Sequence, residues 1–226
     1  MQALILAAGF GVRLREIIHG RPKHLAPING KPFLRHLLQL LKRHGFKRII
    51  LSIGYLSQYI LDEFNEDQKE FGLIFSDTKR PLGTAGSLKK AQNYLKDDFF
   101  VINGDTYLDV DYQQILKFHT QHSNLLTLVG TNKNQHGSII RADHGQVVKF
   151  IYHPDKAIPA SFRHAGIAVV SPQLFSLIPS ATKYSLEKDI IPQLIKKNQL
   201  GFFPVNQAFI DIGTPLEYQK AILKLK

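Results

Sequence analysis

The chain opens with an apolar run that breaks into small residues and glycines. Ala3–Ala7 has the length and composition typical of a buried strand, and Gly9 and Gly11 follow it closely. Glycine lets the backbone approach an anion, and successive backbone N–H groups can bind that anion. Arg13 and, ten residues later, Lys23 add positive charge. The sequence therefore predicts an anion-binding loop at the end of the first strand.

Two common phosphate-binding patterns do not fit this loop. A dinucleotide fingerprint requires Gly-x-Gly-x-x-Gly, and the third glycine position is Leu14. A P-loop requires Gly-Lys followed by Ser or Thr, whereas Gly30-Lys31 is followed by Pro32. Taken alone, the loop is equally consistent with a simple tight turn, so its function depends on the motifs that accompany it.

Strand and helix patterns alternate through the first half of the chain. We expect strands at Ala3–Ala7, Lys47–Ile53, Leu73–Ser76 and Asp98–Ile102, and helices at Pro32–His44, Leu56–Phe64, Thr84–Leu95 and Asp111–Gln121. Such alternation favours an α/β fold: a Rossmann-like, mostly parallel sheet with helices on both faces.

The pattern changes after Asn124, where strands follow one another with turn residues between them. We expect strands at Leu125–Gly130, Ser138–Ala142, Val147–Tyr152, Ala165–Val170, Leu200–Val205 and Ala208–Ile212, and helices at Pro172–Ile178, Leu186–Lys197 and Pro215–Leu225. This order predicts an antiparallel extension of the sheet. We expect one domain, 1–226, with a nucleotide-binding half, 1–123, and a second half, 124–226.

Three further motifs follow predicted strands or open predicted helices. Pro81–Gly86 opens a helix, Asn103-Gly104-Asp105 ends a strand, and Asp211–Pro215 follows a late strand. In open α/β sheets, ligands bind at the carboxyl ends of the strands. Magnesium takes one or two carboxylates together with substrate phosphates. Asp105 and Asp211 are therefore candidate Mg²⁺ ligands facing a phosphate-binding loop.

Composition limits the compartment and the partners. The chain has 29 Lys and Arg against 18 Asp and Glu, a formal charge of +11, which suits phosphorylated molecules, nucleic acid or an anionic membrane. The basic residues are spread along the chain, so we expect neither a nucleic-acid nor a membrane partner. There is no cysteine, which excludes disulfides and thiolate metal sites, and no signal peptide or membrane span is visible. We expect a cytoplasmic protein.

Together these motifs resemble the sugar-phosphate nucleotidyltransferases, the family that makes nucleotide sugars. The resemblance runs from Met1 to about Ala221, and the motifs, including Pro22-Lys23, occur in the family's order. The stretches 26–34 and 103–107 are most similar to the heptose 1-phosphate guanylyltransferases. The compact hexose 1-phosphate and N-acetylmuramate 1-phosphate enzymes are near relatives.

The resemblance implies a GT-A-like fold and a Mg²⁺-dependent reaction. A nucleoside monophosphate would pass from an NTP, with GTP favoured, to a heptose or hexose 1-phosphate, and pyrophosphate would leave. The product would feed polysaccharide biosynthesis, and the enzyme would be a monomer or homodimer. The alternatives are a non-catalytic nucleotide-sugar binding or regulatory subunit and a uridylyltransferase of the N-acetylmuramate 1-phosphate type.

The resemblance also assigns roles to residues. The catalytic group is Arg13, Lys23, Asp105 and Asp211, of which the two aspartates would bind the metal. The nucleotide would contact Leu6, Ala7, Ala8, Gly9, Gly11, Arg13, Lys23, Gly83, Thr84, Gly104 and Asp105. The sugar phosphate would contact Gly137, His153, His164, Gly166 and Glu187.

The chain departs from the family's pattern in its sugar-binding half. Family members usually carry Glu-Lys where this chain has Tyr152-His153, and their Asn-Ala-Gly is here His164-Ala165-Gly166. Both changes favour an enzyme for an unusual sugar phosphate, with a nucleotide-binding subunit that lacks catalysis as the alternative.

Overall fold

The computed structural model describes residues 1–9, 11, 14, 17–134, 136–152, 154, 161–180 and 182–225. The chain forms two compact units, and neither is one continuous stretch of sequence. Unit 1 comprises Met1–Pro81, Asn103–Tyr107 and Ile210–Lys226, and unit 2 comprises Leu82–Ile102 and Leu108–Phe209. The division that we expected between residues 123 and 124 therefore falls inside unit 2.

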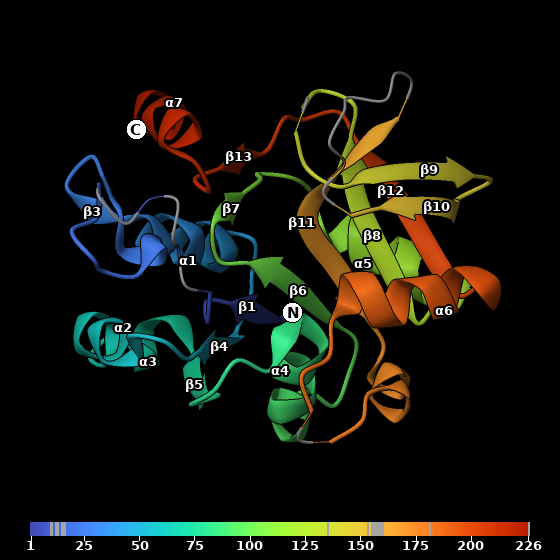
Figure 1. Ribbon diagram of the computed structural model, residues 1–226, viewed down its shortest axis with the longest axis horizontal. Coiled ribbons are helices and arrows are strands. Elements are labelled where there is room, and N and C mark those ends of the chain that lie inside the picture. The colour runs from blue at the N-terminus through green and yellow to red at the C-terminus, as the bar shows by residue number, and fades with distance from the viewer. Residues whose placement is uncertain are drawn as a thin grey trace. The chain divides into compact units, whose positions relative to one another are not determined.

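Unit 1 is built on three parallel strands in the order β5-β4-β1 (Figure 1). The strands are β1 (Gln2–Leu6), β4 (Arg48–Ile53) and β5 (Leu73–Asp77), and the helices are α1 (Phe33–Arg43), α2 (Ser57–Phe64) and α3 (Gln68–Phe71). Leu4 and Ile50 are register partners and are fully buried, as are Leu37 and Leu41 on α1. The apolar runs predicted these strands because strands buried on both faces are apolar throughout.

Shorter elements complete unit 1. They are η2 (Lys23–Leu25), the paired strands β2 (Pro27–Ile28) and β3 (Lys31–Pro32), the paired strands β7 (Thr106–Tyr107) and β13 (Ile210–Asp211), and α7 (Pro215–Lys224). Tyr218 of α7 donates a 2.6 Å hydrogen bond to the carbonyl of Pro27, and Ala221 packs in a core cluster with Leu14 and Phe33. The C-terminal helix thereby closes the core beside the N-terminal loops.

Unit 2 carries strands in the order β6-β11-β8-β12-β10-β9 (Figure 1). Neighbouring strands are antiparallel, except that β12 runs parallel to β8. The bounds are β6 (Phe99–Asn103), β8 (Leu126–Thr131), β9 (Ile139–Asp143), β10 (Gln146–Ile151), β11 (Phe162–Val170) and β12 (Leu200–Val205). The mixed α/β fold that we expected is thus confirmed.

The helices of unit 2 differ from the prediction in two places, because the single helix expected at 84–95 is an α-helix followed by a 3-10 turn, and the one expected at 186–197 is also divided. They are α4 (Gly83–Ala91), η3 (Gln92–Tyr94), α5 (Tyr112–His122), η4 (Pro172–Leu177), η5 (Leu186–Ile190) and α6 (Ile191–Lys196). Asp111 caps α5 by accepting hydrogen bonds from the N–H groups of Gln113 and Gln114, as its position suggested. The single helix expected at 186–197 is instead a π-helical turn, η5, followed by α6. No helix in the described part of the chain is long and apolar enough to cross a bilayer.

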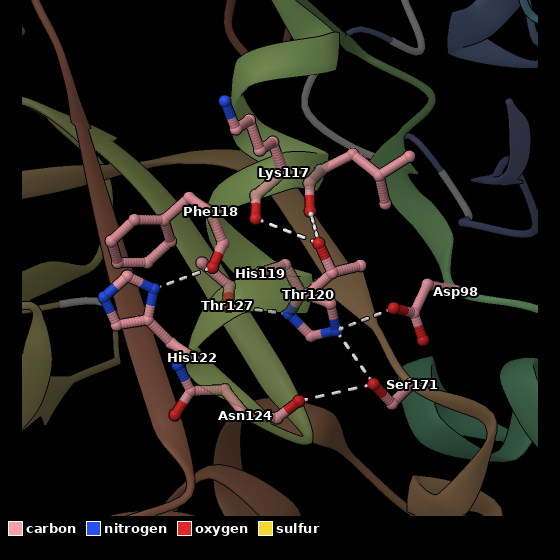
Figure 2. A network of polar contacts seen from close by, with 10 residues as sticks. Asp98, Lys117, Phe118, His119, Thr120, His122, Asn124, Thr127 and Ser171 are labelled. Carbon is pink, nitrogen blue, oxygen red and sulfur yellow. Dashed lines mark hydrogen bonds and ion pairs between the residues drawn. The ribbon is translucent and has the colours of Figure 1, made fainter.

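A buried histidine connects α5 to the strands of unit 2 (Figure 2). His119 is 1% exposed; its Nδ1 lies 2.7 Å from the hydroxyl of Thr127, and its Nε2 lies 2.9 Å from that of Ser171 and 3.8 Å from Asp98. The Ser171 hydroxyl donates to the carbonyl of Asn124, so it accepts from Nε2–H, and the Thr127 hydroxyl donates to Nδ1. The neutral imidazole is therefore the form that satisfies this network.

The free energy of unfolding should fall as the pH is lowered from about 7 to about 5. Burial lowers the pKa of His119, against the opposing charge of Asp98, and burial and Lys23 lower the pKa of His24 to about 3. Histidines of the unfolded chain titrate near pH 6.5, so below that pH the unfolded state binds protons that the folded state excludes. His119→Gln should flatten this pH dependence by at most about 1.4 kcal/mol per pH unit.

Urea unfolding at pH 7.5, 6.5 and 5.5 measures this dependence. His144→Gln is the matched control, because the His144 side chain is 94% exposed and its removal leaves the buried hydrogen-bond network of His119 intact. Equal slopes for the wild type and His119→Gln would contradict the assignment of a neutral buried imidazole.

Candidate active site

An ion pair between Lys23 and Asp105 lies at the centre of the candidate site in unit 1. The ammonium of Lys23, from η2, contacts Oδ2 of Asp105, from the turn between β6 and β7. The two side chains are 19% and 15% exposed. Burial by itself raises the pKa of Asp105, but the charge of Lys23 and its hydrogen bond more than offset this, and the pKa lies below its usual value. Asp105 is therefore ionised at neutral pH.

Gly104 brings Asp105 against the end of β1. Its N–H donates a 3.0 Å hydrogen bond to the carbonyl oxygen of Leu6. A Cβ at Gly104 would lie 2.9 Å from that oxygen and 2.8 Å from Cδ2 of His24. The Asn-Gly-Asp motif thus needs glycine because the backbone of β1 leaves no space for a side chain.

The glycine loop packs on the Lys23 side chain. Gly11 has φ of +60°, and a Cβ there would lie 3.1 Å from Cβ of Lys23; a Cβ on Gly9 would lie 3.9 Å from Cε of Lys23. Positive φ at Gly11 is the left-handed conformation that glycine adopts without strain. Unit 1 therefore brings together the predicted residues Leu6, Gly9, Gly11, Lys23, Gly104 and Asp105, whereas Arg13 lies outside the described residues.

Asp211 lies on the strand that pairs with the one following Asp105. In the β13–β7 pair Asp211 is opposite Thr106, and the N–H of Ile212 donates a 3.0 Å bond to the carbonyl of Asp105. Oδ1 of Asp211 accepts from the N–H of Gly213, which fixes the carboxylate in its turn. The two aspartates therefore occupy adjacent chain segments, one residue apart in register.

These two carboxylates fit a magnesium ion by their chemistry. Oxygen ligands are the ones that Mg²⁺ prefers, and Asp105 is held in its ionised form. No group of three or more His, Cys, Asp or Glu side chains in the described part of the chain could hold a metal on its own. An ion at Asp105 and Asp211 would take its other ligands from water and from phosphate oxygens, as Mg²⁺ commonly does.

In unit 2, Glu187 is held by two hydroxyl groups. Thr84 Oγ1 and Ser185 Oγ each donate a 2.7 Å hydrogen bond to Glu187 Oε2. Thr84 lies in the first turn of α4, and Glu187 lies in η5. Gly83 has φ of +72°, and a Cβ there would lie 2.5 Å from the carbonyl oxygen of Tyr184, so glycine is required where α4 begins.

His164 joins this group from β11. The register of β11 against β8 shifts between His164 and Ala168, and Gly166 in that bulge has φ of +67°. Burial lowers the pKa of His164, while the charge of Glu187 acts in the opposite direction. Burial and the same Glu187 carboxylate raise the pKa of Tyr152. Glu187, His164 and Tyr152 therefore interact electrostatically.

Of the predicted sugar-side residues, unit 2 brings His164, Gly166 and Glu187 together. Gly137 is also close, because a Cβ there would lie 3.4 Å from the carbonyl oxygen of His164. His153 lies outside the described residues. The bulge explains Gly166, since a register shift with a positive φ is a position that glycine fills most easily.

Sequence reasoning missed His24. Its side chain is fully buried, and neither ring nitrogen has a hydrogen-bond partner among the described residues. Burial and the charge of Lys23 lower its pKa to about 3, with Asp105 opposing them, so the ring is neutral beside the ion pair. Its position next to Lys23 was the only signal, and no spacing pattern distinguished it from the other nine histidines of the chain.

The α/β fold of the chain carries a glycine loop after β1 beside the ion pair of Lys23 and Asp105, and comparisons with known proteins identify the family that shares this fold. A model of the nucleotidyl transferase family matches residues 2–226. The chain therefore belongs to that family, which confirms the resemblance drawn from its motifs.

Three relatives illustrate the range within the family. UTP–glucose-1-phosphate uridylyltransferase of Synechocystis is 32% identical over 98% of this chain, and the match spans only 62% of that relative. D-glycero-alpha-D-manno-heptose 1-phosphate guanylyltransferase of Campylobacter jejuni is 31% identical, and the match covers 96% of this chain and 97% of that protein. The crystal structure of HddC from Yersinia pseudotuberculosis has a TM-score of 0.88 at 31% identity, covering 100% of this chain and 99% of the solved one.

Gly104→Ala should destabilise unit 1 by about 1–3 kcal/mol, because its Cβ would overlap the Leu6 carbonyl and the His24 ring. Gly9→Ala is the matched control for stability: among the residues that the structure describes, its Cβ would meet no atom nearer than 3.9 Å, so the change should stay within about 0.5 kcal/mol. Urea unfolding at pH 7.5 measures both. Equal stability of the two variants would show that the close packing at Gly104 is not required.

Proposed function

We propose that this chain is a Mg²⁺-dependent sugar 1-phosphate nucleotidyltransferase. It transfers a nucleoside monophosphate from an NTP, with GTP favoured, to a heptose or hexose 1-phosphate. The observation that carries the proposal is the Lys23–Asp105 pair packed on the Gly9–Gly11 loop, with Asp211 on the adjacent segment. The family of the chain and the similarity to a heptose 1-phosphate guanylyltransferase over nearly its whole length support it.

The reaction is an in-line displacement at phosphorus. An oxygen of the sugar 1-phosphate attacks the α-phosphorus, a new P–O bond forms, the bond to the bridging oxygen of the β-phosphate breaks, and pyrophosphate leaves with that electron pair. Little covalent work falls to the protein, so its residues align the substrates and neutralise charge.

Different residues align the substrates and neutralise their charge. The N–H groups of Gly9 and Gly11 bind the triphosphate, Lys23 neutralises the reacting phosphates, and Arg13 holds the leaving pyrophosphate. The resemblance assigns the base to the backbone near Leu6 and Ala8 with Gly83 and Thr84, and it assigns Ala7 and Gly104 to the nucleotide. Asp105 and Asp211 hold Mg²⁺, which supplies charge neutralisation at the phosphates when bound. Gly137, His153, His164, Gly166 and Glu187 form the sugar-phosphate side.

Relatives named as uridylyltransferases and as guanylyltransferases match this chain at similar identity, so identity alone does not assign the base. HddC has also been solved in complex with GMP-PN, at a TM-score of 0.87 to this chain, which favours a guanine nucleotide. A uridylyltransferase is the second candidate, since the Synechocystis relative at 32% identity is one. The changes at Tyr152-His153 and His164 favour an enzyme for an unusual sugar phosphate, and a subunit that binds nucleotide sugars without turnover is the third candidate.

Pyrophosphate release assayed with four NTPs against a panel of sugar 1-phosphates separates these candidates. We expect Mg²⁺-dependent release that is fastest with GTP and a heptose or hexose 1-phosphate. Fastest release with UTP would assign a uridylyltransferase. Saturable nucleotide-sugar binding with no release for any pair would refute catalysis and assign the binding subunit.

Asp105→Asn should lower kcat about 100- to 1,000-fold, because it removes one charge from the metal and phosphate site while preserving the shape of the side chain. Asp143→Asn is the matched control; Asp143 is 70% exposed on β9, and its loss should leave kcat unchanged. Circular dichroism checks that both variants fold. Turnover of Asp105→Asn within a few-fold of the wild type would remove Asp105 from the metal site.

A further inference from the structure

The proton of the Thr84 hydroxyl is used in a hydrogen bond inside unit 2. It donates to Oε2 of Glu187 at 2.7 Å and accepts from the N–H of Leu186 at 2.8 Å. A hydroxyl has a single proton, so Thr84 cannot donate to a substrate while it donates to Glu187. Although Thr84 belongs to the motif that we assign to the nucleotide, its side chain is directed at the sugar-phosphate side.

Among the described residues, only one of the two carboxylate oxygens of Glu187, Oε2, accepts hydrogen bonds. Oε2 accepts from Thr84 and from Ser185, and the Ser185 hydroxyl in turn accepts a 3.2 Å bond from the N–H of Lys188. Among the described residues Oε1 accepts no hydrogen bond, which leaves it for a hydroxyl of a ligand. Hydrogen bonds to an ionised acceptor are stronger than neutral ones, so two of them fix the carboxylate plane.

Backbone bonds hold the same two segments together independently of Thr84. The N–H of Gly86 donates to the carbonyl of Tyr184 at 3.1 Å, and the N–H of Tyr184 donates to the carbonyl of Leu82 at 2.8 Å. Removing the Thr84 hydroxyl should therefore release the carboxylate without separating α4 from η5. Glu187 also lies in a π-helical turn, a feature frequent at functional sites.

We infer that Thr84 is a positioning residue for the sugar phosphate, acting through Glu187. The inference rests on the proposed function, since it assigns Glu187 to the sugar. Thr84 contributes to nucleotide binding through its backbone, and its hydroxyl sets the direction in which Glu187 Oε1 accepts a sugar hydroxyl. One motif thus serves both substrates by different atoms of the same residue.

Thr84→Val tests the inference because valine keeps the shape and removes the hydroxyl. The KM for the sugar 1-phosphate should rise about tenfold or more, and the KM for the NTP should change much less. Thr84→Ser should keep the KM for the sugar 1-phosphate near that of the wild type, because serine retains the hydroxyl. Thr120→Val is the control, since within the described part of the chain the Thr120 hydroxyl bonds only to carbonyls of its own helix, α5, and its loss should change neither KM (Figure 2).

A double-mutant cycle separates a positioning role from an independent one. In a Glu187→Ala background, Thr84→Val should have no further effect on the sugar 1-phosphate KM, because the group that it orients is gone. Additive effects of the two changes, or a Thr84→Val effect confined to the NTP, would overturn the inference.

Calorimetric titration distinguishes failure of the inference from failure of the proposed function. The probes are GDP-mannose and UDP-glucose, each compared with GDP or UDP. Thr84→Val should weaken the binding of the nucleotide sugar and leave the binding of the diphosphate unchanged, whether or not the wild type releases pyrophosphate. A wild type that binds each sugar nucleotide no more tightly than its diphosphate, or a Thr84→Val variant that weakens both equally, would overturn the inference by itself.

Discussion

The ion pair of Lys23 and Asp105 is the interaction on which the candidate site in unit 1 depends. A carboxylate with 15% exposure is unfavourable unless it is paired, because burial removes its hydration. A short 3-10 turn, a glycine loop and the turn before β7 all converge on this pair. Pairs of this kind add little net stability, because desolvation offsets their attraction. Their value lies in holding a cation and an anion in fixed positions.

His24 lies beside that ion pair, and its lowered pKa keeps its ring uncharged at neutral pH. Its neutral, fully buried ring lies so close to Gly104 that a Cβ there would lie 2.8 Å from its Cδ2. Interactions between charges grow as the local dielectric falls, so a dry, uncharged neighbour makes Lys23 a better charge partner. The close approach of Asp105 to β1 thus explains Gly104, which leaves space for the Leu6 carbonyl and the His24 ring.

The sequence predicted the long elements well because their apolar residues are continuous or periodic. The bounds of β12 at Leu200–Val205 match the prediction at both ends. The sequence did not predict elements that are too short to show a period, because η2, β2, β3 and β7 have two or three residues each. The motifs predicted which residues of unit 1 meet, whereas the Thr84–Glu187 bond joins positions 103 residues apart and leaves no local pattern.

The changes in the sugar-binding half differ in their chemical consequence. Burial lowers the pKa of His164, and its Nε2 lies 3.3 Å from the carbonyl of Ile167, so the neutral ring donates Nε2–H to that carbonyl and keeps Nδ1 as an acceptor where the family usually has asparagine. Tyr152 in place of glutamate removes a negative charge, and the ammonium of Lys188 lies 5.6 Å from the centre of its ring. The carboxylate of Glu187, held by two hydroxyls, interacts electrostatically with the rings of both His164 and Tyr152. A single oriented acceptor beside a cation and two neutral rings suits a ligand that combines hydroxyl groups with a phosphate.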